Sequence, residues 1–106
     1  GLAAVEQMLA KNTVYPTALV AFNDRLALGA IQAIHQAGLR VPDDISVIGY
    51  DNSDQAKYSM PKITTVEIHA PLMAQTASRM LFQQIDDYEV LTPVELIEQD
   101  SVRPLE

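Results

Sequence analysis

Two predominantly apolar runs with a helical stretch between them most constrain how this chain can fold. The runs span residues 17–22 and 45–50, and they lack the apolar–polar alternation of a half-solvated strand. Such runs are typical of parallel strands that are covered on both faces. Residues 25–37 between them form a helical pattern that ends at Gly38, a residue suited to the left-handed position after a helix. Residues 17–51 therefore predict one βαβ unit.

Polar side chains follow both predicted strands. A right-handed crossover makes the two strands parallel, so Asn23 and Asp51 would lie at carboxyl ends on the same edge of the sheet. Open α/β sheets bind ligands at that edge. A carboxylate accepts hydrogen bonds from two hydroxyls, and an amide both donates and accepts, so the pair suits a polyol or sugar. We predict Asn23 and Asp51 as ligand-binding residues.

Each of these residues also has a local structural interpretation. Asn23 or Asp24 can cap the following helix. Asp24 is next to the helix and is the expected cap, which would leave Asn23 facing the cleft. Asp51 can instead bond its own backbone in a turn. Acid–base chemistry at Asp51 is a further interpretation, but no second carboxylate is apparent to partner it, as glycoside hydrolysis requires.

The remaining pattern predicts further elements around this unit. A first helix covers residues 1–11 and is broken at Asn12 and Thr13. It starts without an N-cap or a preceding strand, so we expect the chain to be part of a longer protein. The later elements are a polar loop at 52–60, a strand at 63–68, a helix at 71–85 opened by Pro71 and closed by Asp86 and Asp87, and a strand at 94–97. The expected buried stripe of the 71–85 helix is Ala74, Ala77, Leu81 and Ile85.

Composition and motifs exclude several classes of function. The chain has 106 residues, enough for one domain, and its net charge of −7 argues against direct contact with nucleic acids or anionic membranes. It has no cysteine, and His35 and His69 do not have metal-ligand spacing. No nucleophile elbow or phosphate-binding glycine loop is present. No apolar run approaches the ~20 residues of a membrane span and no signal peptide opens the chain, so we expect a cytoplasmic protein. From the motif search we expect no catalytic residues, no metal and no cofactor.

The helix at 25–37 is more apolar than one sheet contact requires. Its alanine-rich face would pack on the sheet, whereas Leu28 and Ile31 lie on a flank beside His35. These two residues are either the edge of the same core or a surface for a partner helix.

A family resemblance covers essentially the whole chain. Residues 17–30, TALVAFNDRLALGA, resemble the strand-and-helix signature of the LacI/GalR family of bacterial transcription repressors. The similarity continues through 38–52 and 61–66, and residues 99–104 resemble the closing segment of the family.

This resemblance implies an α/β fold with a three-layer, doubly wound parallel sheet, the C-terminal portion of a periplasmic-binding-protein-like type I fold. The family domain has two lobes. Residues 1–67 would belong to the C-terminal lobe, residues 68–97 to the N-terminal lobe, and residues 98–106 would return to the C-terminal lobe. The chain would then be a partial effector-binding domain.

The resemblance also implies a function. The chain would be the sugar- or metabolite-sensing and dimerisation region of a non-enzymatic repressor, with operator DNA bound by an N-terminal helix-turn-helix outside it. Effector contacts carry over to Asn23 and Asp51, and dimer contacts to Leu28, Ile31 and Tyr58. The third wall of the pocket departs from the family pattern, with Ile68, His69 and Ala70 in the corresponding places. The alternatives are a periplasmic or lipoprotein sugar-binding protein of an ABC transporter and a small α/β enzyme using Asp51.

Overall fold

The computed structural model describes residues 1–11 and 13–105. Asn12, where the first helix is expected to break, and Glu106 lie outside the described residues. The elements in chain order are α1 (Leu2–Lys11), β1 (Ala18–Val20), α2 (Asp24–Gln36), β2 (Ser46–Ile48), α3 (Asp54–Tyr58), β3 (Thr65–Glu67), α4 (Ala70–Leu81) and β4 (Glu95–Ile97).

The predicted βαβ unit is confirmed. β1 and β2 pair in parallel, with Ala18 opposite Ser46 at one end. The helix between them ends as expected at Gly38, which has φ 79° and donates its N–H to the carbonyl of His35 at 3.0 Å. The next N–H, that of Leu39, reaches the carbonyl of Ile34 at 3.1 Å, which completes a Schellman motif.

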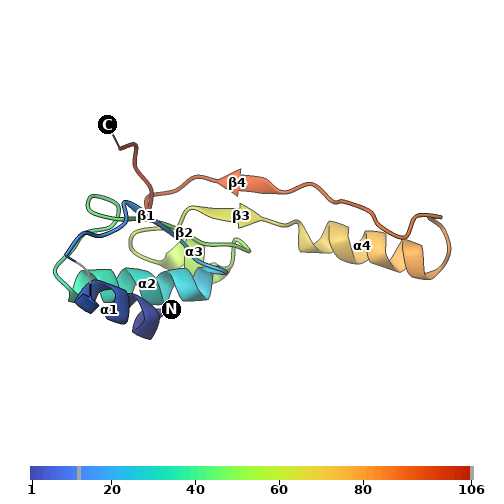
Figure 1. Cartoon of the computed structure of the whole chain (residues 1–106). Coiled ribbons are helices and arrows are strands. Elements are labelled where there is room, and N and C mark those ends of the chain that lie inside the picture. Colours follow the sequence, from blue (N-terminus) through green and yellow to red (C-terminus); the bar gives the residue numbers. More distant parts are fainter. Residues whose placement is uncertain (12, 106) are drawn as a thin grey trace.

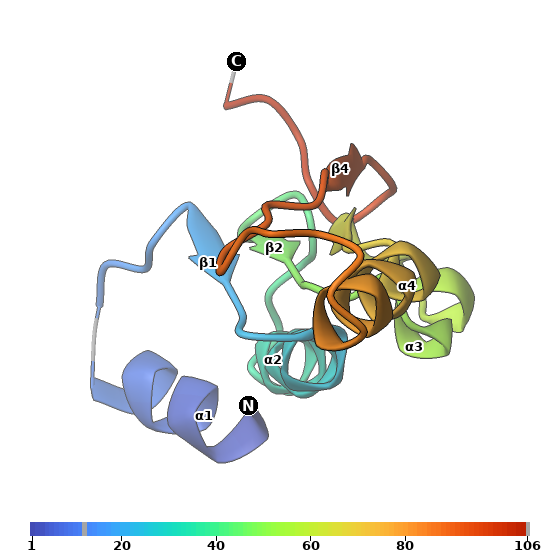
Figure 2. The same ribbon diagram turned by 90° about the vertical axis from the view of Figure 1, so that its right-hand side faces the viewer.

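The core lies between this small sheet and the helices α1 and α2, which lie on one side of it (Figures 1 and 2). Its largest fully buried apolar side chains come from α2, from β2 and the residue before it, and from the segment that leads into β3. They are Ile34, Ile45, Val47 and Ile63.

The opposite face of β1 is uncovered, contrary to the expectation that both faces of this strand are buried. Val20 is 80% exposed and Phe22, just beyond the strand, is 85% exposed. The apolar run has the composition of a doubly covered strand, but the helices that pack on it here come from one side only. The α/β class and the parallel pairing hold, whereas the third layer is not formed by the described residues.

The predicted polar loop at 52–60 contains a short helix, α3, which corrects the sequence interpretation. Ser53 stands at its N-cap position with extended backbone, yet its side chain makes no capping hydrogen bond to the helix. The small apolar residue Ala56 is fully buried and fixes this helix to the core.

β3, β4 and α4 form an arm that extends from the body (Figure 1). β3 and β4 pair antiparallel, with Thr65 opposite Ile97 and Glu67 opposite Glu95. The molecule measures 55 × 24 × 24 Å, and its radius of gyration of 17.1 Å exceeds the ~13 Å of a compact domain of this length. The chain is therefore elongated, with α4 at the far end of the arm.

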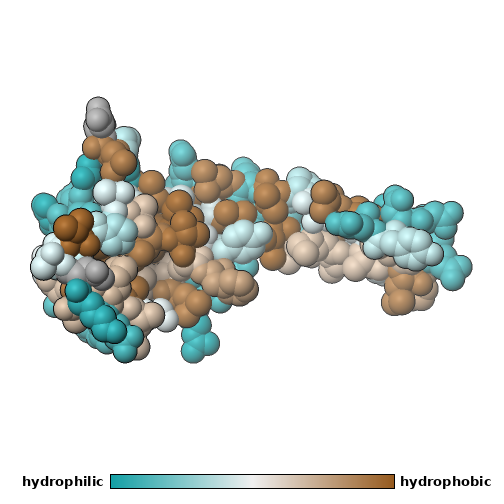
Figure 3. All heavy atoms as spheres, in the orientation of Figure 1, coloured by the Kyte–Doolittle hydropathy of each residue, from teal (hydrophilic) through white to brown (hydrophobic). Residues whose placement is uncertain are grey.

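The expected buried stripe of the last helix is not buried. α4 has no buried residue, and Ala74, Ala77 and Leu81 are exposed. The apolar spacing is present, but no other described element packs on it. Figure 3 shows apolar side chains on the surface of both the body and the arm. None of the helices within residues 1–11 and 13–105 combines the length and apolar character needed to span a membrane.

The end of α4 also differs from the expected position at Asp86–Asp87. The helix stops at Leu81, and Gln83 takes the left-handed conformation with φ 58°. The N–H of Gln84 then donates to the carbonyl of Arg79 at 2.8 Å. This is again a Schellman motif, formed without the glycine that would mark it in the sequence.

The turn before β2 contains ion pairs from Arg40 to Asp43 and to Asp44, at 3.7 and 3.2 Å. Asp44 accepts from the backbone N–H of Arg40 at 2.7 Å and from its Nε at 3.2 Å. The side-chain hydrogen bond from Arg40 lowers the pKa of the Asp44 carboxyl and raises that of the guanidinium. Because both groups are exposed to solvent, the pair mainly orients the turn.

Candidate functional site

Asn23 and Asp51 occupy equivalent positions after the two parallel strands. The paired register ends at Val20 and Ile48. Beyond it the N–H of Asp24, next to Asn23, donates to the carbonyl of Tyr50, next to Asp51, at 3.0 Å. The two chain segments therefore meet at the predicted carboxyl edge, while the ligand-binding role of Asn23 and Asp51 stays a prediction.

The capping assignment is reversed from the one expected. Asn23 is the N-cap of α2: its backbone is extended and its Oδ1 accepts from the N–H of Leu26 at 2.9 Å. Asp24 is the first helical residue, and its side chain turns inward. Capping uses the carbonyl oxygen of the Asn23 amide, so its NH₂ group remains as the donor available to a ligand.

Asp51 has an unusual backbone. Its φ of 103° and the φ of 50° at Asn52 lie in the left-handed region that L-residues rarely adopt. The N–H of Asp51 donates to the carbonyl of Val66 at 3.0 Å, which ties this turn to β3. Its side chain is exposed, and among the described residues no hydrogen bond reaches its carboxylate. The carboxylate is thus open to solvent at the edge.

A buried hydrogen-bond network behind this edge was not foreseen from the sequence. Asp24 is 1% exposed, and its Oδ2 accepts from the N–H and hydroxyl of Ser53 at 2.7 and 2.8 Å. Its Oδ1 accepts from the hydroxyl of Thr65 at 2.5 Å, and Thr65 Oγ1 accepts from the N–H of Asn52 at 3.2 Å. The network joins α2, the turn after β2 and β3. The Asn-Asp pair before a helix was the only signal, and it indicated a cap.

The C-terminal tail fastens the root of the arm to β2. Buried Ser101 donates its hydroxyl to the carbonyl of Val47 and accepts the N–H of Thr64 at 2.8 Å. Gln99 donates its side-chain amide to the carbonyl of Ile63 at 2.7 Å. β2, β3 and the tail are therefore locked together beside the turn that carries Asp51.

His69 lies between β3 and α4, at the N-cap position of the helix. Its Nδ1 is 3.8 Å from Glu67 Oε1, and its Nε2 is 3.9 Å from Glu95 Oε2. Because Glu67 and Glu95 are cross-strand partners, the imidazole stands between two like charges. In the part of the chain that the structure describes, no group of three or more acidic or histidine side chains has a geometry that could hold a metal ion.

The three predicted dimer residues have different surroundings. Leu28 is 37% exposed and Tyr58 is 84% exposed, so both offer apolar surface. Ile31 is 2% exposed and belongs to the core, because this flank of α2 packs inward. Leu28 and Ile31 line a surface hollow of about 330 Å³ that also includes His35 and Met60. The dimer contact of Leu28, Ile31 and Tyr58 stays a prediction.

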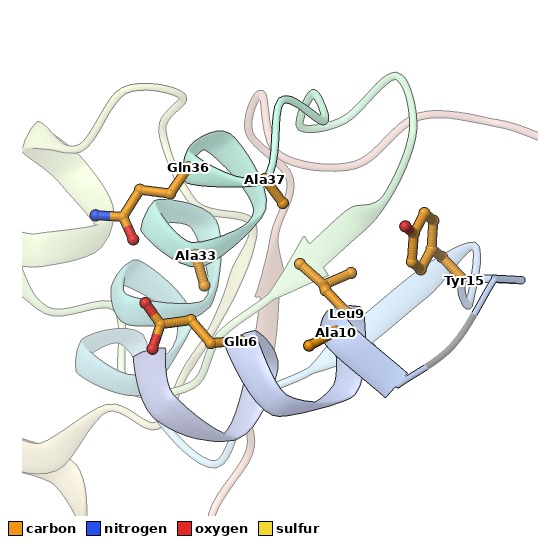
Figure 4. A pocket seen from close by; sticks show the side chains of 7 residues that line it. All are labelled: Glu6, Leu9, Ala10, Tyr15, Ala33, Gln36 and Ala37. Atoms are coloured by element: carbon orange, nitrogen blue, oxygen red, sulfur yellow. The ribbon is translucent and has the colours of Figure 1, made fainter.

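A separate hollow of about 300 Å³ lies between α1 and the C-terminal part of α2 (Figure 4). Leu9 and Ala33 form its apolar floor, and Glu6 and Gln36 stand at its rim. Asn23 begins α2, whereas Ala37 in this hollow follows its last residue, so about 20 Å of helix separates the hollow from the Asn23–Asp51 edge.

Comparison with known families identifies this architecture. The profile of a family described as periplasmic binding protein-like domain matches residues 1–102. The chain belongs to this family. As a periplasmic-binding-protein-like chain, it has the α/β fold with parallel pairing that the sequence resemblance implies.

Its relatives within the family are bacterial repressors. The chain is 47% identical over 85 residues to the HTH-type transcriptional repressor PurR of Aliivibrio fischeri, which covers 79% of this chain and 25% of the relative. It is 39% identical over 95 residues to the PurR of Vibrio cholerae, which covers 85% of this chain and 28% of that protein. The predicted LacI/GalR resemblance is confirmed, and this periplasmic-binding-protein-like chain spans about a quarter of the length of these curated relatives.

Solved structures of LacI-type regulators have the same fold as this chain. The lac repressor dimer bound to operator and the anti-inducer ONPF superposes with a TM-score of 0.86 at 34% identity, covering 95% of this chain and 36% of that chain. A LacI-type transcription regulator from Bifidobacterium animalis subsp. lactis gives a TM-score of 0.81 at 33% identity, covering 97% and 38%. The elongated shape with its projecting arm is thus compatible with a larger periplasmic-binding-protein-like domain.

Proposed function

We propose that this chain is the effector-sensing and dimerisation part of a LacI-type transcriptional repressor, and that a small hydroxylated metabolite binds at its carboxyl edge. The observation that carries the proposal is the placement of Asn23 and Asp51 at the carboxyl ends of two hydrogen-bonded parallel strands. An amide NH₂ and an exposed carboxylate at one edge match the donor and acceptor pattern of a sugar or a related polyol.

The relatives support a repressor over a transporter component. They are named as transcriptional repressors, and one solved neighbour is bound to operator and an anti-inducer. With its net charge of −7, this chain is poorly suited to bind DNA itself. Operator binding would therefore belong to a helix-turn-helix elsewhere in the polypeptide, and the repressor would act in the cytoplasm without chemistry of its own.

The shape of the chain supports a division between two lobes. Residues 1–67 hold the core and the Asn23–Asp51 edge, and residues 68–97 include the arm helix α4, which lacks a covering layer. Residues 98–105 run back to the body, where Ser101 bonds to β2. We assign residues 1–67 and 98–106 to one lobe and residues 68–97 to the other, so that the chain would cross between the lobes just after β3 and just after β4.

Exposed apolar side chains on α2 and around the end of α3 support dimerisation. Leu28 lies on α2, Tyr58 ends α3 and Met60 follows it, and Leu28 and Met60 line the same hollow. Exposed apolar patches of this kind mark association surfaces. A two-fold contact would bring this surface against itself in the partner.

The ligand assignment leads to a first prediction. In the full-length protein, Asp51→Ala should weaken effector binding by about 1.5–3 kcal/mol, the scale of hydrogen bonds to a charged group. That corresponds to a loss of roughly 10- to 150-fold in affinity. The effector is first selected by thermal shift from a set of monosaccharides and nucleosides, and affinity is then measured by calorimetric titration.

Asn23 requires a variant that keeps its cap. Asn23→Ala would remove both the cap and the donor, whereas Asn23→Ser keeps a capping oxygen and removes only the NH₂ group. Asn23→Ser should therefore weaken effector binding, by less than Asp51→Ala, with an unchanged unfolding midpoint. Unchanged affinity in both Asp51→Ala and Asn23→Ser would contradict the assignment of the binding edge.

A further inference from the structure

We propose that Asp24 is a positioning residue for effector binding, whose buried carboxylate holds residues 51–53 so that Asp51 faces the ligand. This inference rests on the proposed function and adds to it a residue that would not touch the effector. Asp24 is 1% exposed, so a ligand at the edge cannot reach it.

Both carboxylate oxygens of Asp24 are already engaged in hydrogen bonds within the chain. Oδ2 receives the N–H and the hydroxyl of Ser53 at 2.7 and 2.8 Å, and Oδ1 receives the hydroxyl of Thr65 at 2.5 Å. The same Thr65 oxygen accepts the N–H of Asn52 at 3.2 Å. Three of these four hydrogen bonds end on the two residues that follow Asp51, so the network determines the course of the chain at the binding edge.

The backbone of the turn at residues 51 and 52 depends on these contacts. Asp51 and Asn52 both have positive φ, at 103° and 50°, and such conformations persist only where surrounding contacts impose them. One contact comes from β3, since Val66 accepts the N–H of Asp51 at 3.0 Å. The others come from Asp24 through Ser53 and Thr65. Without them the turn would relax and the Asp51 carboxylate would leave its place beside Asn23.

The residue after the neighbouring strand leaves room for the Asp24 carboxylate. Gly49 follows β2, and a Cβ built there would overlap Asp24 Oδ1 and lie 3.1 Å from Asp24 Cα. Only glycine leaves this space, because the clash is with a carboxylate that hydrogen bonds hold in place. The Asp24 carboxylate therefore occupies a buried space between α2 and the residue after β2, and Asn23 caps α2 in its place.

The test uses the full-length protein and removes the hydroxyl of Thr65, which bonds to Asp24 and to the N–H of Asn52. Thr65→Val keeps the shape of the side chain and removes the hydroxyl, and Thr65→Ser is the matched control that keeps it. Amide hydrogen exchange at Asn52 and Ser53 should accelerate at least tenfold in Thr65→Val and stay near wild type in Thr65→Ser. The amide of Ala21, bonded to the carbonyl of Ile48, reports on the sheet and should be unchanged.

A second readout separates positioning from general stability. D-glucose, D-galactose and D-ribose are each titrated, and the sugar with the highest affinity is kept as the probe. Thr65→Val should weaken its binding about tenfold in the wild-type background and less than twofold in the Asp51→Ala background. This non-additivity is expected if the network of Thr65 and Asp24 acts through Asp51, and Ser53→Ala, whose lost hydroxyl bonds to Asp24, should show it too.

The outcomes distinguish the two proposals. If Thr65→Val leaves exchange at Asn52 and Ser53 unchanged, or weakens the probe equally with and without Asp51, the positioning role of Asp24 is wrong. If Thr65→Val does not fold, Ser53→Ala removes one of the two hydroxyl donors to Asp24 and takes its place in both measurements. If none of the sugars binds, the proposed sugar effector is contradicted, and the exchange result still decides whether Asp24 holds the turn.

Discussion

Produced on its own, the 106-residue chain is expected to form dimers or larger species instead of a stable monomer. The helix α4 has no buried residue, and the open face of β1 exposes Val20 and Phe22. Burying one large apolar side chain stabilises a protein by roughly 1.5–3 kcal/mol. Four such side chains would match the ~5–15 kcal/mol net stability of a whole domain. Light scattering and sedimentation over a concentration series measure the expected association, including exchange of the arm between copies.

Variants of the arm test the cause of this association. Leu72→Gln combined with Leu81→Gln removes apolar surface from α4, where both side chains are exposed. This double variant should shift the chain toward monomer and leave the unfolding of the body unchanged. A single cooperative unfolding transition of a wild-type monomer would show that the open surfaces do not drive association.

Replacing Leu28 with glutamate should convert dimers of the full-length protein into monomers. The same patch meets itself across a two-fold axis, so one substitution places two charges in the interface. A buried charge without a partner costs several kcal/mol, more than a modest dimer contact supplies. Sedimentation velocity at micromolar concentration measures the change in oligomeric state.

Leu26 provides a matched control for this experiment. Leu26 and Leu28 are both 37% exposed and stand two positions apart on α2, hence on opposite flanks of the helix. Leu26→Glu introduces the same charge at the same exposure and should leave the dimer intact. A dimer that survives Leu28→Glu would place the contact on another surface.

The βαβ unit was predictable because each of its features is local. Two apolar runs, a helical stretch and a glycine in the left-handed position determine the strands, the crossover and the end of α2. The position of Asn23 beside Asp51 followed from the parallel pairing alone. These predictions needed no knowledge of distant contacts.

The features that were missed depend on contacts between distant segments. Asp24 would cap α2 by proximity, but Ser53 and Thr65, far along the chain, draw its carboxylate inward, and Asn23 takes the cap. The short helix α3 was hidden in a polar stretch, because its buried contact is the single small residue Ala56.

Two further differences have other physical causes. The helix α4 ends early, at Leu81, because Gln83 takes a left-handed conformation that no glycine signals in the sequence. The stripes on α4 and β1 were correctly recognised as apolar, but periodicity does not tell whether a covering layer is present in the same chain.

A hydrogen bond between Asp51 and β3 couples the binding turn to the movement of the arm. Its N–H is bonded to Val66, the middle residue of the strand that carries the arm. α4 continues about 18 Å beyond that strand, so a small rotation of the two-stranded ribbon becomes a large displacement at the tip of the arm. Conversely, a partner that binds the arm and rotates it would also turn the backbone at Asp51, which lies at the base of the ribbon.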